Sequence, residues 1–152
     1  MKANPKEIKI MQRMQPGIIT LGGFLGNDRR TLNEIIEDDA RLMNALELTP
    51  EDIANRMQYF TDKSWDAFTQ DILIDGIYSV ETEVVRGKLP CPFGHVGIYR
   101  KAITRLTNTR NNISVSWTTL NIHLIRAHGF FEGKGSAFRL EPAELVKAIF
   151  DR

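Results

Sequence analysis

One stretch of the chain holds all of its residues that bind transition metals through a thiolate or an imidazole. The single cysteine, Cys91, and the three histidines His95, His123 and His128 lie within residues 91–128. Thiolate and imidazole are preferred zinc ligands, and a structural zinc site holds four ligands in a tetrahedron. Cys91 and His95 flank a Pro-Phe-Gly turn that can form a knuckle. His123 and His128 belong to a predicted helix. The spacing therefore predicts a Zn²⁺ site that resembles a Cys2His2 finger in outline.

The pattern departs from such a finger in two respects that bear on its geometry. His95 stands where the second cysteine of a finger would be, and 27 residues separate His95 from His123, instead of about 12. The longer segment has room for two additional strands. We therefore expect the turn and the helix to be brought together by a sheet rather than by a short hairpin.

The predicted helix places its two histidines on different sides. At 100° per residue, His123 and His128 point about 140° apart. His128 falls near the centre of the apolar face, which consists of Trp117, Leu120 and Leu124. Convergence on one ion requires the helix to loosen at its end, where Gly129 follows.

Two other interpretations of these residues stay open. His128 can be a buried histidine at a helix C-terminus, where the dipole favours a cation, with Cys91 a small core residue and the other histidines on the surface. Alternatively, Cys91 can be a nucleophile with His95 or His123 as its base, in an enzyme. No Asp or Asn that would orient such a base is identifiable in the sequence, although Asn121 lies near His123.

A second candidate site is a glycine-rich loop. Residues 132–136 read Glu-Gly-Lys-Gly-Ser, which has the composition of a phosphate-binding loop but not the order of a P-loop. Its backbone amides, with Lys134 and Arg139, form a possible anion-binding site.

The elements expected around these sites change type along the chain. Helical apolar spacing and capping signals predict helices over 6–14, 32–46, 50–57 and 64–72. Alternating apolar residues predict strands over 77–85, 98–106 and 113–117. Two helices follow, over 118–128 and 142–150. This order predicts an α+β fold in one domain of residues 1–152: an N-terminal helical half packed on a C-terminal antiparallel three-stranded sheet with one or two helices.

Charge divides the chain in the same way. Residues 1–76 contain 9 Lys/Arg and 13 Asp/Glu, a net charge of −4, whereas residues 77–152 contain 11 and 6, a net charge of +5. The basic half favours an anionic partner such as a nucleic acid, unless the two halves only attract each other. No apolar run reaches the roughly 18 residues of a membrane span, and the N-terminus lacks a signal-peptide core. A single cysteine suits a reducing compartment, so we expect a cytoplasmic protein.

Two blocks of the sequence carry a resemblance. The segments 23–29 (GFLGNDR) and 123–136 (HLIRAHGFFEGKGS) are similar to blocks of a small bacterial family of uncharacterised proteins. The resemblance implies a bacterial source, and it does not indicate any activity for this chain.

The sequence thus favours a non-catalytic or regulatory cytosolic protein with one structural zinc. One alternative is a nucleic-acid or anion binder that uses the basic half. The other is a small metal-dependent hydrolase.

Overall fold

The computed structural model describes residues 3–151. Its elements, in chain order, are α1 (Pro5–Arg13), α2 (Leu32–Ala45), α3 (Pro50–Ser64), β1 (Ile72–Ile74), β2 (Tyr78–Pro90), β3 (Ile98–Asn108), β4 (Ile113–Thr118), α4 (Thr119–His128) and α5 (Pro142–Phe150). The strands form an antiparallel sheet in the order β1-β2-β3-β4. The α+β class is confirmed, although this sheet has four strands rather than the three predicted.

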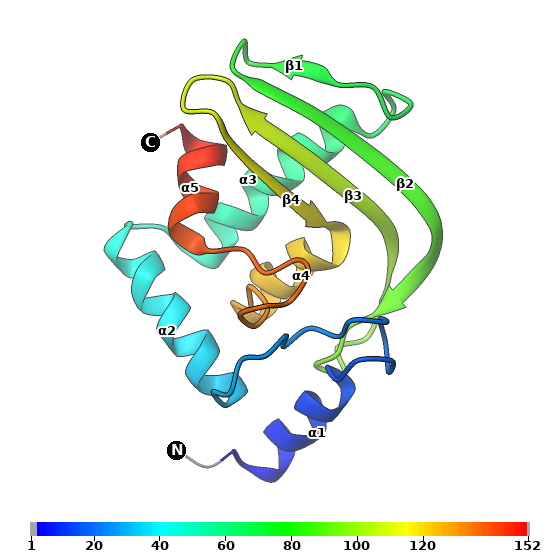
Figure 1. Cartoon of the computed structure of the whole chain (residues 1–152), viewed down its shortest axis with the longest axis vertical. Helices are drawn as coiled ribbons and strands as arrows, with labels where there is room; N and C mark the ends of the chain where they lie inside the picture. The colour runs from blue at the N-terminus through cyan, green and yellow to red at the C-terminus, as the bar shows by residue number, and fades with distance from the viewer. Residues whose placement is uncertain (1–2, 152) are drawn as a thin grey trace.

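The sheet curves around the helices that it covers, with α4 in the hollow of β2 and β3 (Figure 1). Each of the first four helices begins with a capping box, in which the cap side chain and the third helical residue exchange hydrogen bonds with each other's backbone. The cap residues are Asn4, Thr31, Thr49 and Thr118. These signals are local, which is why the starts of α2 and α3 were predictable from the sequence.

The predicted helix over 64–72 is wrong. The preceding helix continues to Ser64, and Phe68 and Thr69 then adopt positive φ angles of 53° and 64°, which a right-handed helix does not permit. Ile72 instead begins the short edge strand β1. Its hairpin to β2 turns at Asp75 and Gly76, both with positive φ. Asp-Gly is a strong hairpin signal, and in this sequence it outweighs the helical spacing of three apolar residues.

Two hydrophobic clusters fill the space between the sheet and the helices. The larger joins α3, α5 and the sheet around Phe60, Trp117 and Leu106, and it includes residues from both halves of the chain. The smaller joins α1, α2 and α4 and contains Cys91 and Leu124. Leu124 is fully buried, which confirms the predicted apolar face of α4.

Two glycine-bearing segments pair directly beside the smaller cluster. The N–H of Gly133 donates to the carbonyl of Phe24 at 2.8 Å, and the N–H of Asn27 donates to the carbonyl of Lys134 at 3.1 Å. A Cβ at Gly26 would lie 2.3 Å from the backbone nitrogen of Ser136. The close approach of the two backbones therefore requires glycine.

No helix within residues 3–151 has the length and apolar character needed to cross a membrane.

Candidate metal centre

Cys91 follows the last residue of β2 and begins a tight turn. The N–H of Gly94 donates to the carbonyl of Cys91 at 3.0 Å, and Gly94 has a φ of 81°, which explains the glycine at this position. The guanidinium of Arg13 in α1 donates to the carbonyl of Pro92 at 2.6 Å. The turn is thus held by the sheet on one side and by α1 on the other, and the thiol of Cys91 is buried.

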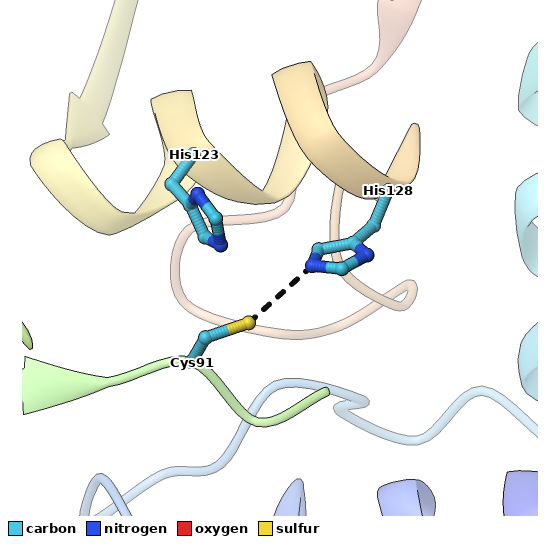
Figure 2. Close-up of side chains that lie close together, drawn as sticks. All are labelled: Cys91, His123 and His128. Carbon is cyan, nitrogen blue, oxygen red and sulfur yellow. Dashed lines mark hydrogen bonds between the residues drawn. The ribbon is translucent and has the colours of Figure 1, made fainter. Parts of the chain in front are cut away.

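Both histidines of α4 extend toward that thiol (Figure 2). Viewed down the helix axis, the i, i+5 spacing directs the side chains of His123 and His128 about 70° to either side of a midline. This midline falls between the directions of the Leu120 and Leu124 side chains. Leu124 packs in the same cluster as Cys91, so the turn lies over the strip of α4 between the two histidines. They converge although α4 stays helical through His128, and Gly129 ends it in the left-handed conformation with a φ of 63°. The predicted loosening of the helix is therefore not needed.

The distances match a shared ligand sphere. The Sγ of Cys91 lies 3.5 Å from Nε2 of His128. One ligand atom from each of Cys91, His123 and His128 lies within 4.8 Å of the other two. A single ion can therefore contact all three residues after small side-chain adjustments.

His95 approaches the same group from the solvent side. Its Nδ1 lies 3.3 Å from Nε2 of His123, and its ring centroid lies 5.4 Å from that of His128. In a tetrahedral zinc site, nitrogen ligands lie about 3.4 Å apart and sulfur and nitrogen about 3.6 Å apart, from bond lengths of about 2.05 and 2.3 Å. The His95–His123 and Cys91–His128 distances, which are hydrogen bonds in this structure, are close to two edges of such a tetrahedron. His95 does not belong to the group of three residues whose ligand atoms all lie within 4.8 Å of one another, so its side chain must move closer to complete the tetrahedron.

Two aromatic side chains orient the imidazoles. The hydroxyl of Tyr99 lies 3.0 Å from Nδ1 of His123, which leaves Nε2 directed at the cluster. If Nε2 held a metal, Nδ1 would carry the proton and donate a hydrogen bond to the Tyr99 oxygen, which would fix the orientation of the ring. Phe93 stacks on His128 with a centroid distance of 3.9 Å and an interplanar angle of 6°. The sequence did not indicate either role, because neither aromatic has a diagnostic spacing from the histidines.

The surroundings keep two imidazoles neutral. Burial, with the nearby charges of His123 and His95, lowers the pKa of His128 to about 4. Burial, His95 and Arg126 lower the pKa of His123 as well. A neutral imidazole offers a free lone pair, so these side chains can bind a cation near pH 7 without first releasing a proton.

The glycine-rich loop has a different arrangement. The guanidinium of Arg139 forms a bidentate ion pair with Asp39 and a further pair with Glu141. Its side chain is only 6% exposed, whereas Lys134 is exposed. Arg139 is therefore engaged within the protein, and the predicted anion site at Lys134 and Arg139 receives no support from these contacts.

Comparison with protein-family models, with curated proteins and with solved structures found no match to this chain. The resemblance to a small bacterial family stays a prediction.

Proposed function

We propose that this protein binds one zinc ion through Cys91, His95, His123 and His128, and that the ion has a structural role in a non-catalytic cytosolic protein. The carrying observation is the group of Cys91, His123 and His128, whose ligand atoms all lie within 4.8 Å of one another. The Nδ1 of His95, 3.3 Å from Nε2 of His123, offers the fourth ligand from the solvent side. Thiolate and imidazole ligands favour zinc over the hard cations magnesium and calcium. A cysteine that is in no disulfide and binds a metal suits a reducing compartment.

The surroundings support a structural ion. Cys91 and its turn belong to the cluster that joins α1, α2 and α4. An ion at this position would link the end of β2 to the last turn of α4 across 37 residues of sequence. With four protein ligands, no coordination position is left for a substrate, as in structural zinc sites generally.

Metal analysis of natively purified protein tests the proposal. We expect one zinc per chain in the wild type and a large loss of zinc in Cys91→Ser, His123→Asn and His128→Asn. Arg126→Gln is the matched control, because Arg126 lies on α4 between the histidines but contacts Asn55 instead. Wild-type protein that takes up no zinc, or a Cys91→Ser variant that keeps all of it, contradicts the proposal.

The role of His95 separates a structural site from a catalytic one. A four-ligand site predicts that His95→Asn weakens zinc binding at least ten-fold. Full zinc retention by this variant would instead indicate three protein ligands and an open position, which is the arrangement of a metal-dependent hydrolase.

A second candidate function, nucleic-acid binding, is favoured by one observation. Lys88 and Arg100 are directly opposite in the register of β2 and β3, although like charges in such pairs are destabilising. Arg86 and Lys101 are also exposed at this end of the two strands, although Lys101 follows Arg100 in β3 and therefore points to the other face of the sheet. Among residues 3–151 these four side chains form no salt bridge, whereas Arg105 pairs with Glu81 and Glu83. An unneutralised basic patch of this kind suits phosphates.

A charge-reversal experiment tests the nucleic-acid candidate. Arg100→Glu with Lys101→Glu should weaken binding of single-stranded nucleic acid and flatten its salt dependence. Lys6→Glu with Lys9→Glu, on the exposed side of α1, changes the net charge equally and should have little effect. Equal losses in both double variants, or in neither, would remove this candidate.

A further inference from the structure

A cavity separate from the Cys–His cluster lies at the other end of α4. It is open to solvent on one side, has a volume of about 320 Å³ and is lined by residues 19–24, the facing ends of β2 and β3, the start of α4, and Glu132, Ala137 and Phe138. This volume is at the lower end of the range of small-molecule pockets, about 300–1,000 Å³. Its walls are mainly apolar and include Ile19, Phe24, Val85, Leu89, Ala102 and Leu120.

One carboxyl group is present among the lining residues, that of Glu132. Glu132 is only 4% exposed and has a positive φ of 69°. Left-handed backbone is uncommon for a non-glycine residue and costs energy that the surrounding contacts must offset. Glu132 lies in the segment that pairs with residues 24–27, and the hydrogen bonds of this pairing hold its backbone in place.

The hydrogen bonds of Glu132 fix its carboxyl group as an acceptor. The Oδ1 of Asn121 accepts from the N–H of Thr118 at 2.8 Å, which directs the amide NH2 of Asn121 to Oε2 of Glu132 at 2.8 Å. The hydroxyl of Ser136 donates to Oε1. A carboxylate can accept about four hydrogen bonds, so each oxygen keeps one free acceptor position.

Within residues 3–151, Glu132 has no ion-pair partner. The nearest cation, Arg139, donates to the backbone carbonyl of Glu132 at 2.8 Å while its charge is paired with Asp39 and Glu141. Burial raises the pKa of Glu132 to about 7, although the bonds from Ser136 and Asn121 and the charge of Arg139 oppose this. A buried carboxylate without a counter-ion is unfavourable. A cationic ligand in the adjoining cavity would supply the missing charge.

We propose that this cavity binds a small organic molecule with an apolar body and one protonated amino group, and that the ammonium group forms an ion pair with Glu132. The apolar walls suit the body of such a ligand and exclude a hydrated metal ion, which needs several oxygen ligands. Arg100 and Lys101 also contribute to the lining, and both are exposed. Their charges oppose any cation in the cavity, but solvent and salt screen them, whereas the buried carboxyl of Glu132 is screened less. The lining therefore tolerates no more than one positive group, and the ligand class is a monoamine.

Two probes of the same shape test the proposal: benzylamine and benzyl alcohol, titrated at pH 8 into the protein as purified and followed by NMR chemical shifts. We expect benzylamine to bind at least ten-fold more tightly than the alcohol, with shifts at the amides of Phe24, Ala102 and Leu120. Glu132→Gln should remove this preference and leave both probes with the weak affinity of the alcohol.

A second variant keeps the test decisive if Glu132→Gln fails to fold. Ala102 lines the cavity and is 2% exposed, so Ala102→Leu should fill space and abolish binding of both probes without altering Glu132. Three results would overturn the proposal: equal affinity for the two probes, an amine preference that survives in Glu132→Gln, or shifts that persist in Ala102→Leu. None of these results depends on zinc.

Discussion

The sulfur of Cys91 lies 3.5 Å from Nε2 of His128, although the two residues are 37 positions apart in sequence. The first residue belongs to a turn after β2 and the second ends α4, so their meeting depends on the packing of that turn over the buried side of the helix. The contact therefore reports on the tertiary structure of the second half of the chain.

Cobalt substitution should reveal the thiolate ligand directly. Co²⁺ in the wild-type protein is expected to show a thiolate-to-metal charge-transfer band in the near ultraviolet and intense visible bands of tetrahedral geometry. Cys91→Ser should lose the charge-transfer band because it has no thiolate, while Arg126→Gln keeps it. An unchanged band in Cys91→Ser would exclude Cys91 as a ligand.

Zinc removal should lower stability by an amount set by mass action. At free zinc of 100 times the dissociation constant, binding stabilises the folded state by about 2.7 kcal/mol. We expect chelation to reduce the melting temperature and to increase hydrogen exchange at residues 91–97 and 123–128 before α2. Because α2 contributes no ligand, equal increases in both regions would argue against a local structural role for the ion.

The sequence predicted some of this structure because some of its signals are local. The caps at Thr31 and Thr49 and the apolar face with Leu124 depend on residues within a few positions of each other, and the structure confirms them. β1 was missed because Trp65, Phe68 and Ile72 have helical spacing, whereas its pairing with β2 depends on the turn at residues 75–76.

The site likewise combines features that are local in sequence with features that depend on tertiary packing. The ligand types of Cys91 and the histidines were evident from the sequence, but the orienting contacts of Tyr99 and Phe93 arise only when the loop folds over α4. The glycines that follow Glu132 predict a loop at this position, and no sequence pattern indicates that its carboxyl group is buried. Burial of this group depends on the pairing with residues 24–27, which are distant in sequence.

Glu132 should make stability depend on pH in a recognisable direction. Its pKa is about 7 in the folded protein against an ordinary 4.5, so the folded state binds the proton more tightly than the unfolded state. The stabilisation is complete below about pH 4.5 and is lost as pH rises to about 7. The loss is on the order of 3 kcal/mol, from about 1.4 kcal/mol per pKa unit.

Denaturant unfolding of wild type and Glu132→Gln between pH 4.5 and 8 measures this effect. The difference between the two proteins isolates Glu132, because the carboxylates with lowered pKa values, such as Asp28 and Glu141, are present in both. We expect the glutamine variant to gain stability relative to wild type as pH rises. A constant difference across this range would show that Glu132 does not titrate there.

A chain of buried hydroxyl groups joins α3 to the sheet and should be cooperative. Thr104 Oγ1 lies 2.8 Å from that of Thr61 and 2.9 Å from that of Thr82, and the indole of Trp117 donates to Thr61 at 2.9 Å. Thr104→Val removes one hydrogen-bond partner from each of the buried hydroxyls of Thr61 and Thr82, which keep only Trp117 and Ser64 as partners. We expect it to cost about 1–3 kcal/mol in unfolding free energy. Thr107→Val, on the opposite face of β3, is the control and should change stability by less than about 0.5 kcal/mol. Similar costs at both positions would show that the buried chain adds nothing.

The pairing of residues 24–27 with 132–136 should tolerate no side chain at Gly26. Gly26 has a φ of 58°, and a Cβ there would lie 2.3 Å from the nitrogen of Ser136 and 2.4 Å from the carbonyl oxygen of Lys134, both backbone atoms. Gly76 has a similar φ of 69° but nothing within 4 Å of the corresponding position. Alanine at either site therefore incurs the same strain of left-handed backbone, about 1–2 kcal/mol, and only Gly26→Ala adds a clash. We expect Gly26→Ala to be destabilised by at least about 2 kcal/mol more than Gly76→Ala.

Because the displaced segment contains Glu132, Gly26→Ala should also lower affinity for benzylamine, whereas Gly76→Ala should retain it. Equal stability of the two variants in denaturant unfolding would mean that the two segments do not approach as closely as described.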